Sequence, residues 1–180
     1  MTEQLNWVQW WAFPWRSAHA DWNVADKYRA LDALCRSNHA LASTTLGIPP
    51  CLPATPHVTV LRLALASKAQ LELMLALLSD TCHRPIDGVL SENQHLWCLS
   101  LSKALNPNTV LSHDDDPLQL LRAWVEPTVW QRLRLRFARH RVLALEQKNA
   151  DFYDVHNRLD ILWQAVVWRV TTTTNDERLP

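Results

Sequence analysis

Apolar residues recur every three or four positions in several segments of the chain, which is the spacing of one helix face. In the N-terminal half, such a face predicts a helix over about residues 22–41, with Asp21 as its N-cap. This face consists of Val24, Tyr28, Leu31 and Cys35. A second face predicts a helix that begins near residues 61–68 and ends near residue 79. A brief alternation near residues 58–63 also fits a short strand.

The next segments carry helix start signals. A helix is predicted over about residues 91–105, where Leu90 and Gln94 favour a staple-like start. After a loop, Asp116 can cap another helix, because Pro117 fits the first helical position. The sequence therefore predicts two helix beginnings from their caps as well as from their apolar faces.

The apolar stripe continues through most of the remaining chain. Pro127 is expected to restart or kink the path, and the stripe then consists of Trp130, Leu133, Phe137, Val142 and Leu145. The last predicted helix covers about residues 157–170, and its buried face consists of Leu159, Leu162, Trp163, Val166 and Val170. Residues 171–180 are polar and are expected to form a flexible C-terminal tail.

These segments predict a mainly α-helical fold, with at most a short β element near residues 58–63. We expect a single compact helical domain of about six helices over residues 1–170. Four prolines lie within residues 47–56, so this stretch should run as an extended surface connection and is the best internal boundary. The aromatic residues between Asn6 and Trp22 are expected to cap the core.

Composition places the chain among globular proteins. Of the 180 residues, 48% are hydrophobic and 20% are charged, which favours a folded core. Eighteen basic and 18 acidic residues balance, so no overall field would attract nucleic acid or anionic lipid. The longest apolar stretches, residues 71–78 and 161–170, are shorter than the roughly 20 residues that span a bilayer. The four cysteines form no C-x-x-C pair and follow no signal-peptide pattern, which favours a reducing cytosol.

Two residue types narrow the range of functions. The chain has only two glycines, Gly47 and Gly88, which excludes a Walker loop and a dinucleotide fingerprint, since both need several. Its ten tryptophans favour one class of function instead of excluding one. Tryptophan is enriched where one protein meets another, so this number favours an interaction module.

Two sets of residues resemble chemical sites, and both have a simpler structural explanation. Cys82, His83, His95 and Cys98 match no common zinc framework, so buried thiols and solvent-facing histidines are expected instead. No G-x-S-x-G elbow or cysteine signature supports a hydrolase. Residues 114–116 are three aspartates that are explained better as a helix cap than as a cation site. We therefore predict no enzymatic activity, no cofactor and no metal.

The densest run of charge lies between residues 132 and 141 and includes five arginines. On one continuous helix, Arg132, Arg136 and Arg139 would share one face, and Arg134 and Arg141 would share another. A solvated helix face is one interpretation, and a docking surface for an acidic partner is the other. Nucleic acid is disfavoured as the partner, because the rest of the chain is not basic.

The C-terminal half resembles a known family in three runs of sequence. These are residues 115–124 (DDPLQLLRAW), 130–137 (WQRLRLRF) and 158–169 (RLDILWQAVVWR). They resemble the K component of bacterial type III secretion sorting platforms, called SctK generically and HrpD in the Hrp systems of plant-associated bacteria. The turn at residues 85–88 and the early residues Trp15, His19 and Trp22 are also compatible.

The resemblance implies a cytoplasmic, mostly helical adaptor without enzymatic activity, at the cytosolic face of the bacterial inner membrane. In that family the K component joins the Q component of the pod to the cytoplasmic domain of the inner-membrane ring D component, and it acts indirectly with the L component and the ATPase. Such an adaptor would reach the membrane through protein contacts alone and would bind no nucleic acid. The residues predicted to bind partners are Arg132, Arg134, Arg136, Arg139, Arg141, Trp124, Trp130 and Trp168.

The alternative is a secretion chaperone or another helical module that binds proteins. An effector-class chaperone would usually be an acidic α/β dimer, whereas this chain is neutral and its pattern is helical. The composition and periodicity therefore favour the adaptor.

Overall fold

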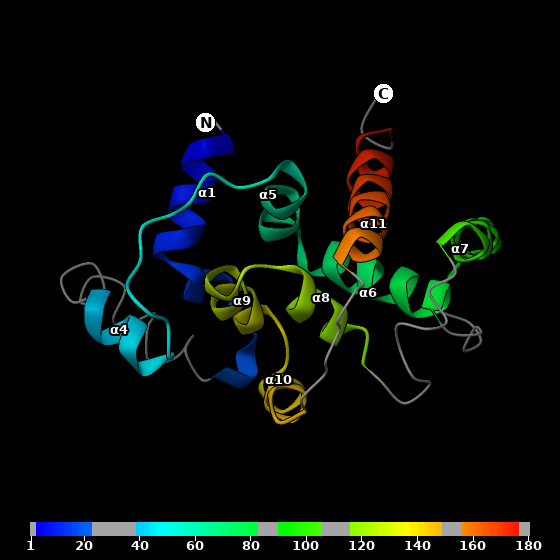
Figure 1. Cartoon of the computed structure of the whole chain (residues 1–180). Helices are drawn as coiled ribbons and strands as arrows, with labels where there is room; N and C mark the ends of the chain where they lie inside the picture. Colours follow the sequence, from blue (N-terminus) through cyan, green and yellow to red (C-terminus); the bar gives the residue numbers. More distant parts are fainter. Residues whose placement is uncertain (1–2, 23–38, 83–89, 106–115, 149–155, 177–180) are drawn as a thin grey trace. The chain divides into compact units, whose positions relative to one another are not determined.

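The computed structural model describes residues 3–22, 39–82, 90–105, 116–148 and 156–176, and within these ranges every regular element is helical (Figure 1). The elements are α1 (Glu3–Ala12), η1 (Pro14–Ser17), η2 (Ala20–Trp22), α4 (His39–Thr45), α5 (Val58–Leu65), α6 (Lys68–Cys82), α7 (Glu92–Leu105), α8 (Leu118–Trp124), α9 (Pro127–Leu133), η4 (Arg134–Arg136), α10 (Arg139–Glu146) and α11 (His156–Asp176). The mainly α-helical fold is confirmed.

The chain divides into two compact units. Unit 1 comprises Met1–Pro56 and Val125–Asn149, and unit 2 comprises His57–Trp124 and Ala150–Pro180. The chain therefore first passes from unit 1 to unit 2 between Pro56 and His57, at the end of the proline-rich stretch of residues 47–56. The prediction of one domain over residues 1–170 stays a prediction, and the two units are described separately.

Unit 1 has an aromatic core that begins in α1. Trp7, Trp10 and Trp11 are buried, and the ring centroids of Trp7 and Trp10 lie 5.0 Å apart. The indole nitrogens of Trp7 and Trp11 donate to the carbonyl oxygens of Ala54 and Cys51, both at 3.0 Å. The N-terminal tryptophans therefore belong to the core of this unit and also hold the extended proline-rich stretch through its backbone.

A second cluster in unit 1 closes around the end of α4. Its buried members are Trp15, Ala42, Leu46, Ile48 and Leu135. Gly47, with a φ of 65°, ends the helix, because Gly47 N and Ile48 N donate to the carbonyls of Thr44 and Ser43. A Cβ at Gly47 would lie 3.1 Å from Nη2 of Arg134, so glycine suits both the left-handed backbone and the close approach. The predicted helix over residues 22–41 lies mostly outside the described residues.

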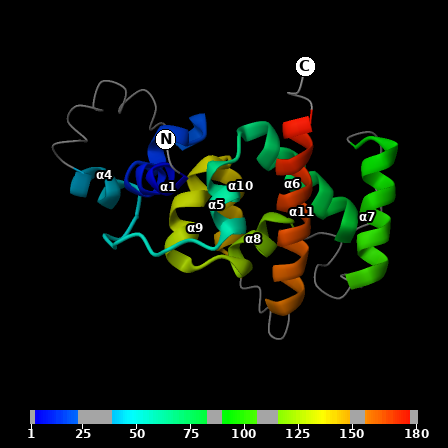
Figure 2. The same ribbon diagram turned by 90° about the horizontal axis from the view of Figure 1, so that it is seen from above.

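Unit 2 is organised around α11. This helix packs against α5, α6, α7 and α8, and Figures 1 and 2 show it with α5 on one side and α7 on the other. Its predicted buried face is confirmed, and Val167 is buried beside it. The helix continues past the predicted end at Val170 to Asp176. Most of the other fully buried side chains of this unit are aliphatic, and they include Leu63, Met74, Leu77, Leu78, Leu118, Leu120 and Leu121.

Local caps set several helix boundaries in unit 2. Ser67 and Gln70 exchange side-chain to backbone hydrogen bonds at 2.8 and 3.2 Å, and Ser91 and Gln94 do the same at 2.8 and 3.4 Å. Both pairs are capping boxes, which start α6 and α7. The predicted cap at Asp116 is confirmed, since Leu118 N donates to its Oδ1 at 2.8 Å.

The sequence-based helix assignment differs from the structure in two details. Residues 58–63 belong to a separate helix, α5, which begins at Val58 because His57 Nδ1 accepts a hydrogen bond from Thr59 N, and α6 then begins at Lys68, within the predicted range. The stripe after Pro127 is also divided, since Phe137 is extended and separates η4 from α10. The described residues consequently hold nine α-helices and three 3₁₀ helices, more than the six predicted.

Candidate functional site

Arg132, the first arginine of the charged run, lies inside unit 1. Its side chain is only 3% exposed, and its guanidinium stacks 3.8 Å from the ring centroid of Trp11. Its nitrogens donate to the carbonyls of Trp11 at 3.1 Å and Thr128 at 2.8 Å, and to Sγ of Cys51 at 3.6 Å. Burial lowers the pKa of Arg132. The contacts make Arg132 a link between α1, α9 and the proline-rich stretch, where it is inaccessible to a partner.

Arg134 is also held within unit 1. Its Nη1 lies 3.1 and 3.2 Å from the two carboxylate oxygens of Glu146, and its Nη2 donates to the carbonyl of Leu46 at 2.8 Å. The same carboxylate accepts a hydrogen bond from the indole nitrogen of Trp130 at 3.0 Å, and Trp130 is buried. One carboxylate therefore joins two of the predicted partner-binding residues to each other.

The arginine run forms no single basic helix face. Because the chain is extended at Phe137, Arg132 lies in α9, Arg134 and Arg136 in η4, and the last two arginines in α10. Burial lowers the pKa of Arg136 as well. The predicted helix face shared by Arg134 and Arg141 is therefore absent, and Arg134 is among the more enclosed arginines.

The outer side of α10 is the part of the run that meets solvent. Arg139 and His140 are exposed there, and Leu143 and Lys148 are exposed further along. His140 Nδ1 lies 3.5 Å from Oδ2 of Asp21. Arg141 is half-buried. We call Arg139, His140 and Leu143, together with Lys148 two residues beyond the end of the helix, the α10 face.

The predicted tryptophans differ in accessibility. Trp124 stacks on Trp163 with 5.5 Å between ring centroids, and its indole nitrogen donates to Oδ1 of Asp160 at 3.2 Å. Trp130 is buried in unit 1. Trp168, in contrast, is 60% exposed on α11. Of the three, Trp168 is the one that can contact a partner over much of its ring.

Trp168 borders a groove between α5 and α11, within unit 2. The groove has a volume of about 350 Å³ and is lined by His57, Val58, Thr59, Arg62, Gln164, Ala165, Val167 and Trp168. Sequence reasoning missed Arg62 and Val58, because the brief alternation near residues 58–63 also fits a short strand. The signal was present: Val58, Arg62 and Leu65 have the i, i+4, i+7 spacing of one helix face.

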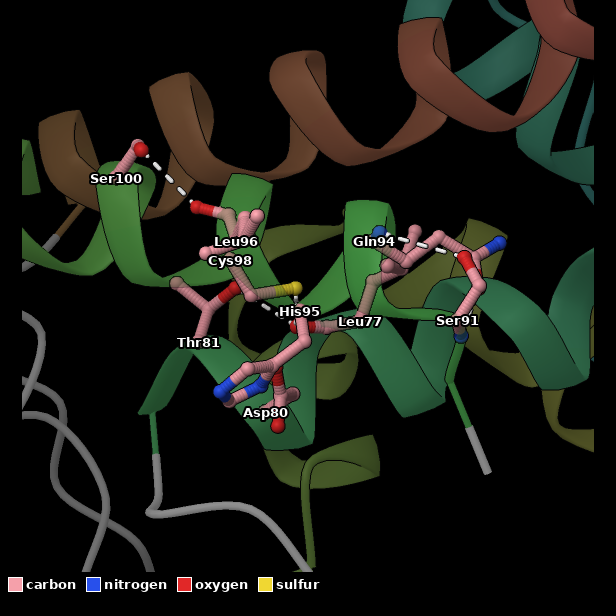
Figure 3. A network of polar contacts seen from close by, with 9 residues as sticks. All are labelled: Leu77, Asp80, Thr81, Ser91, Gln94, His95, Leu96, Cys98 and Ser100. Atoms are coloured by element: carbon pink, nitrogen blue, oxygen red, sulfur yellow. Dashed lines mark hydrogen bonds and ion pairs between the residues drawn. The ribbon is translucent and has the colours of Figure 1, made fainter. Parts of the chain in front are cut away.

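Two members of the cysteine and histidine set, His95 and Cys98, lie on α7 at its contact with α6 (Figure 3). His95 Nδ1 lies 2.9 Å from Oδ2 of Asp80, and Sγ of Cys98 donates to the carbonyl of Leu77 at 3.5 Å. Desolvation, together with the neighbouring Cys98, raises the pKa of Cys82 to about 12, and desolvation raises that of Cys98 to about 11. His83 lies outside the described residues.

These cysteines are structural in character, because a thiolate is the form that attacks or binds metal and both thiols keep their protons at neutral pH. Within the described ranges, no three His, Cys, Asp or Glu side chains gather as a metal ion would require. No helix in those ranges has the length and apolar character needed to cross a membrane. Two accessible features carry residues predicted to bind partners: the α10 face in unit 1, with Arg139, and the α5–α11 groove in unit 2, with Trp168.

Comparison with known proteins assigns no relative: the chain matches no family model, no curated protein and no solved structure.

Proposed function

We propose that the protein is a non-enzymatic adaptor of a bacterial type III secretion system. In this proposal it joins the Q component of the sorting-platform pod to the cytoplasmic domain of the inner-membrane ring D component. The observation that carries the proposal is the sequence resemblance of residues 115–124, 130–137 and 158–169 to the K component of these platforms. The helical character of the chain agrees with that of the family.

The positions of the resembling runs support the proposal. Residues 118–124 form α8, residues 130–137 span parts of α9 and all of η4, and residues 158–169 lie in α11. These runs contribute buried residues to both units, among them Leu118, Trp130 and Trp163. A resemblance that includes core positions is what a shared fold requires, whereas a shared surface motif alone would not need them.

The α10 face is the surface we propose for an acidic partner. Arg139 and His140 bring basic groups to α10, the exposed Leu143 adds apolar area beside them, and the exposed Lys148 follows two residues after the helix ends. Complementary charges accelerate association and select partners, so this face suits a negatively charged surface on the Q or D component. It replaces the wider arginine run as the docking surface.

The proposal is tested with purified proteins. The whole chain is mixed with the Q component and with the cytoplasmic domain of the D component, separately and together, and complexes are detected by size-exclusion chromatography with light scattering. We expect binary complexes with each and a ternary complex with both. If the chain binds neither component, the adaptor assignment fails.

A matched pair of variants separates docking from folding. Arg139→Glu reverses an exposed charge on the α10 face, and Lys103→Glu reverses an exposed charge on α7 in unit 2. We expect Arg139→Glu to weaken binding of one component by about 10-fold at low salt, and Lys103→Glu to leave it unchanged. Tight binding to an exported substrate with no binding to Q or D would favour the chaperone alternative instead.

A further inference from the structure

Exposed apolar residues form two ridges beside the α5–α11 groove, one on α5 and one on α11. Val58 is 58% exposed on α5 and Trp168 is 60% exposed on α11, and both line the groove. Each has an exposed apolar neighbour seven residues away on the same helix, Leu65 at 38% and Ile161 at 52%. Seven residues are about two helical turns, so each pair lies on one face of its helix.

Such an arrangement differs from the scattered apolar residues of an ordinary surface. A single exposed leucine or valine is normal, but apolar side chains that gather along a groove mark sites where proteins bind. Tryptophan is also the residue most enriched among those that dominate binding energy. α5 and α11 pack against each other within unit 2, and one residue of each ridge, Val58 or Trp168, lines the groove between them.

The lining of the groove has a basic side chain and no acidic one. Arg62 is exposed on α5 between Val58 and Leu65, and no aspartate or glutamate is among the lining residues. The acidic residue on the adjoining part of α11, Asp160, already accepts hydrogen bonds from Trp124 and Gln164. Over the described part of the chain, Arg62 has no ion pair. Its guanidinium is therefore available to a carboxylate from another molecule.

We propose that the α5–α11 groove binds an amphipathic helical segment of a partner protein that carries a carboxylate. The apolar side chains of the segment would lie against Trp168 and Val58, and its aspartate or glutamate would pair with Arg62. A helix that binds in a groove presents apolar anchors at i, i+3 or i+4, and i+7 along one of its own faces, which would lie on Val58 and Trp168. The inference does not rest on the secretion assignment, because it concerns unit 2 and the α10 face belongs to unit 1.

The probe is a library of helical peptides displayed on phage. The library fixes an apolar stripe at i, i+4 and i+7 and randomises the flanking positions, and it is selected against the whole chain. We expect the selected peptides to be enriched in aspartate or glutamate beside the stripe. One selected peptide is then synthesised with a fluorescent label, together with a version in which that acidic residue is lysine.

Fluorescence anisotropy compares the two peptides on four variants. Trp168→Ala should weaken binding of the acidic peptide by about 30-fold, the size typical of a dominant interface residue, whereas Leu96→Ala, on the exposed side of α7, should not. Arg62→Glu should reverse the preference, so that the lysine peptide binds more tightly than the acidic one. Lys68→Glu, an exposed charge reversal on α6, should keep the original preference. Circular dichroism checks that each variant folds.

Three results of the peptide experiments would overturn the proposal. They are a selection that yields no binders, binders without an acidic residue, and binders that respond equally to the groove variants and their controls. If the chain self-associates in analytical ultracentrifugation and Trp168→Ala abolishes this, the occupant is a second copy and the proposed partner helix is wrong. None of these results bears on binding of the Q or D component through the α10 face, so the two proposals fail separately.

Discussion

The two units satisfy the hydrogen-bonding groups of their backbones by different means. In unit 1 the helices are short and a proline-rich stretch is extended, so many carbonyl groups lack a partner in their own helix. Distant side chains supply the donors: Trp7 bonds Ala54, Trp22 bonds the carbonyl of Phe137 at 2.9 Å, and Arg132 bonds Trp11. Unit 1 therefore needs side chains that are both large and polar.

Unit 2 includes three longer helices, α6, α7 and α11, whose backbone groups are mostly bonded within the helix. Its boundaries at α6, α7 and α8 are capped by residues three or fewer positions away, such as Ser67 and Asp116. The side chains between its helices can therefore be aliphatic, with Trp163 as the largest fully buried one. The comparison indicates why tryptophan and arginine are concentrated in the core of unit 1: they satisfy irregular backbone while filling space.

The largest expected effect is in unit 2. Trp163 is fully buried and stacks on Trp124, so Trp163→Ala should lower the free energy of unfolding by about 4 kcal/mol. The loss should change little with salt, because the contact is apolar. Urea unfolding at low and high salt measures it. A loss under about 1 kcal/mol would show that the packing around α11 is not the main support of this unit.

Arg134 gives the corresponding test in unit 1. Arg134→Ala removes the pair with Glu146 and the bond to Leu46, and should lower the free energy of unfolding by about 3 kcal/mol. Arg139→Ala, the exposed control, should change it by less than about 0.5 kcal/mol. Thermal and urea denaturation compare the two. Equal effects would mean that Arg134 is only a solvated charge.

These arginines also illustrate where sequence reasoning stopped. Periodicity predicted α7 and α11 well, because long helices are specified by their own apolar face and caps. It failed between residues 130 and 145, where the chain turns at Phe137 so that His19 N can donate to the carbonyl of Leu135 at 2.7 Å. That bond joins residues far apart in the sequence. A pattern read along the chain could not place Arg132 or Arg134, because tertiary hydrogen bonds determine their positions.

The candidate groove had a partial signal in the sequence. Trp168 was among the residues predicted to bind partners, and its exposure on α11 agrees with that role. Arg62 was missed, because eight residues of α5 are too few for periodicity to distinguish a helix from a strand. The α5 side of the groove thus depended on an assignment that only the structure supplied.

The two buried cysteines of unit 2 should make the free energy of unfolding depend on pH. Cys82 and Cys98 in unit 2 keep their protons up to pKa values of about 12 and about 11, whereas an unfolded thiol loses its proton near 9.0. The folded state binds these protons more tightly, so stability is full below about pH 9 and falls as pH rises above it. The expected slope is about 1.4 kcal/mol per pH unit for each thiol.

Urea unfolding at about pH 8 and about pH 10 measures this slope, and Cys82→Ala should reduce it. Cys51 in unit 1 is exposed and should react quickly with iodoacetamide in the folded protein, in contrast to the two buried thiols. Peptide mapping by mass spectrometry measures the three rates. Equal labelling of Cys82 and Cys51 would contradict the burial of the α6–α7 contact.

The smallest effect concerns the helix caps, and it tests the origin of the difference between the units. Ser67 and Gln70 satisfy the first turn of α6 locally, so Ser67→Ala should cost about 1 kcal/mol of unfolding free energy. The end of α4 in unit 1 is instead anchored from a distance, by Arg134 at Leu46. Thr45→Ala, which removes a local bond to the carbonyl of Leu41, is the control and should cost less than about 0.5 kcal/mol.

Amide hydrogen exchange should show the Ser67→Ala effect confined to the first turn of α6, and the Arg134→Ala effect spread over α4, η4 and α10. An equally local effect of both substitutions would mean that the units do not differ in how they satisfy their backbone.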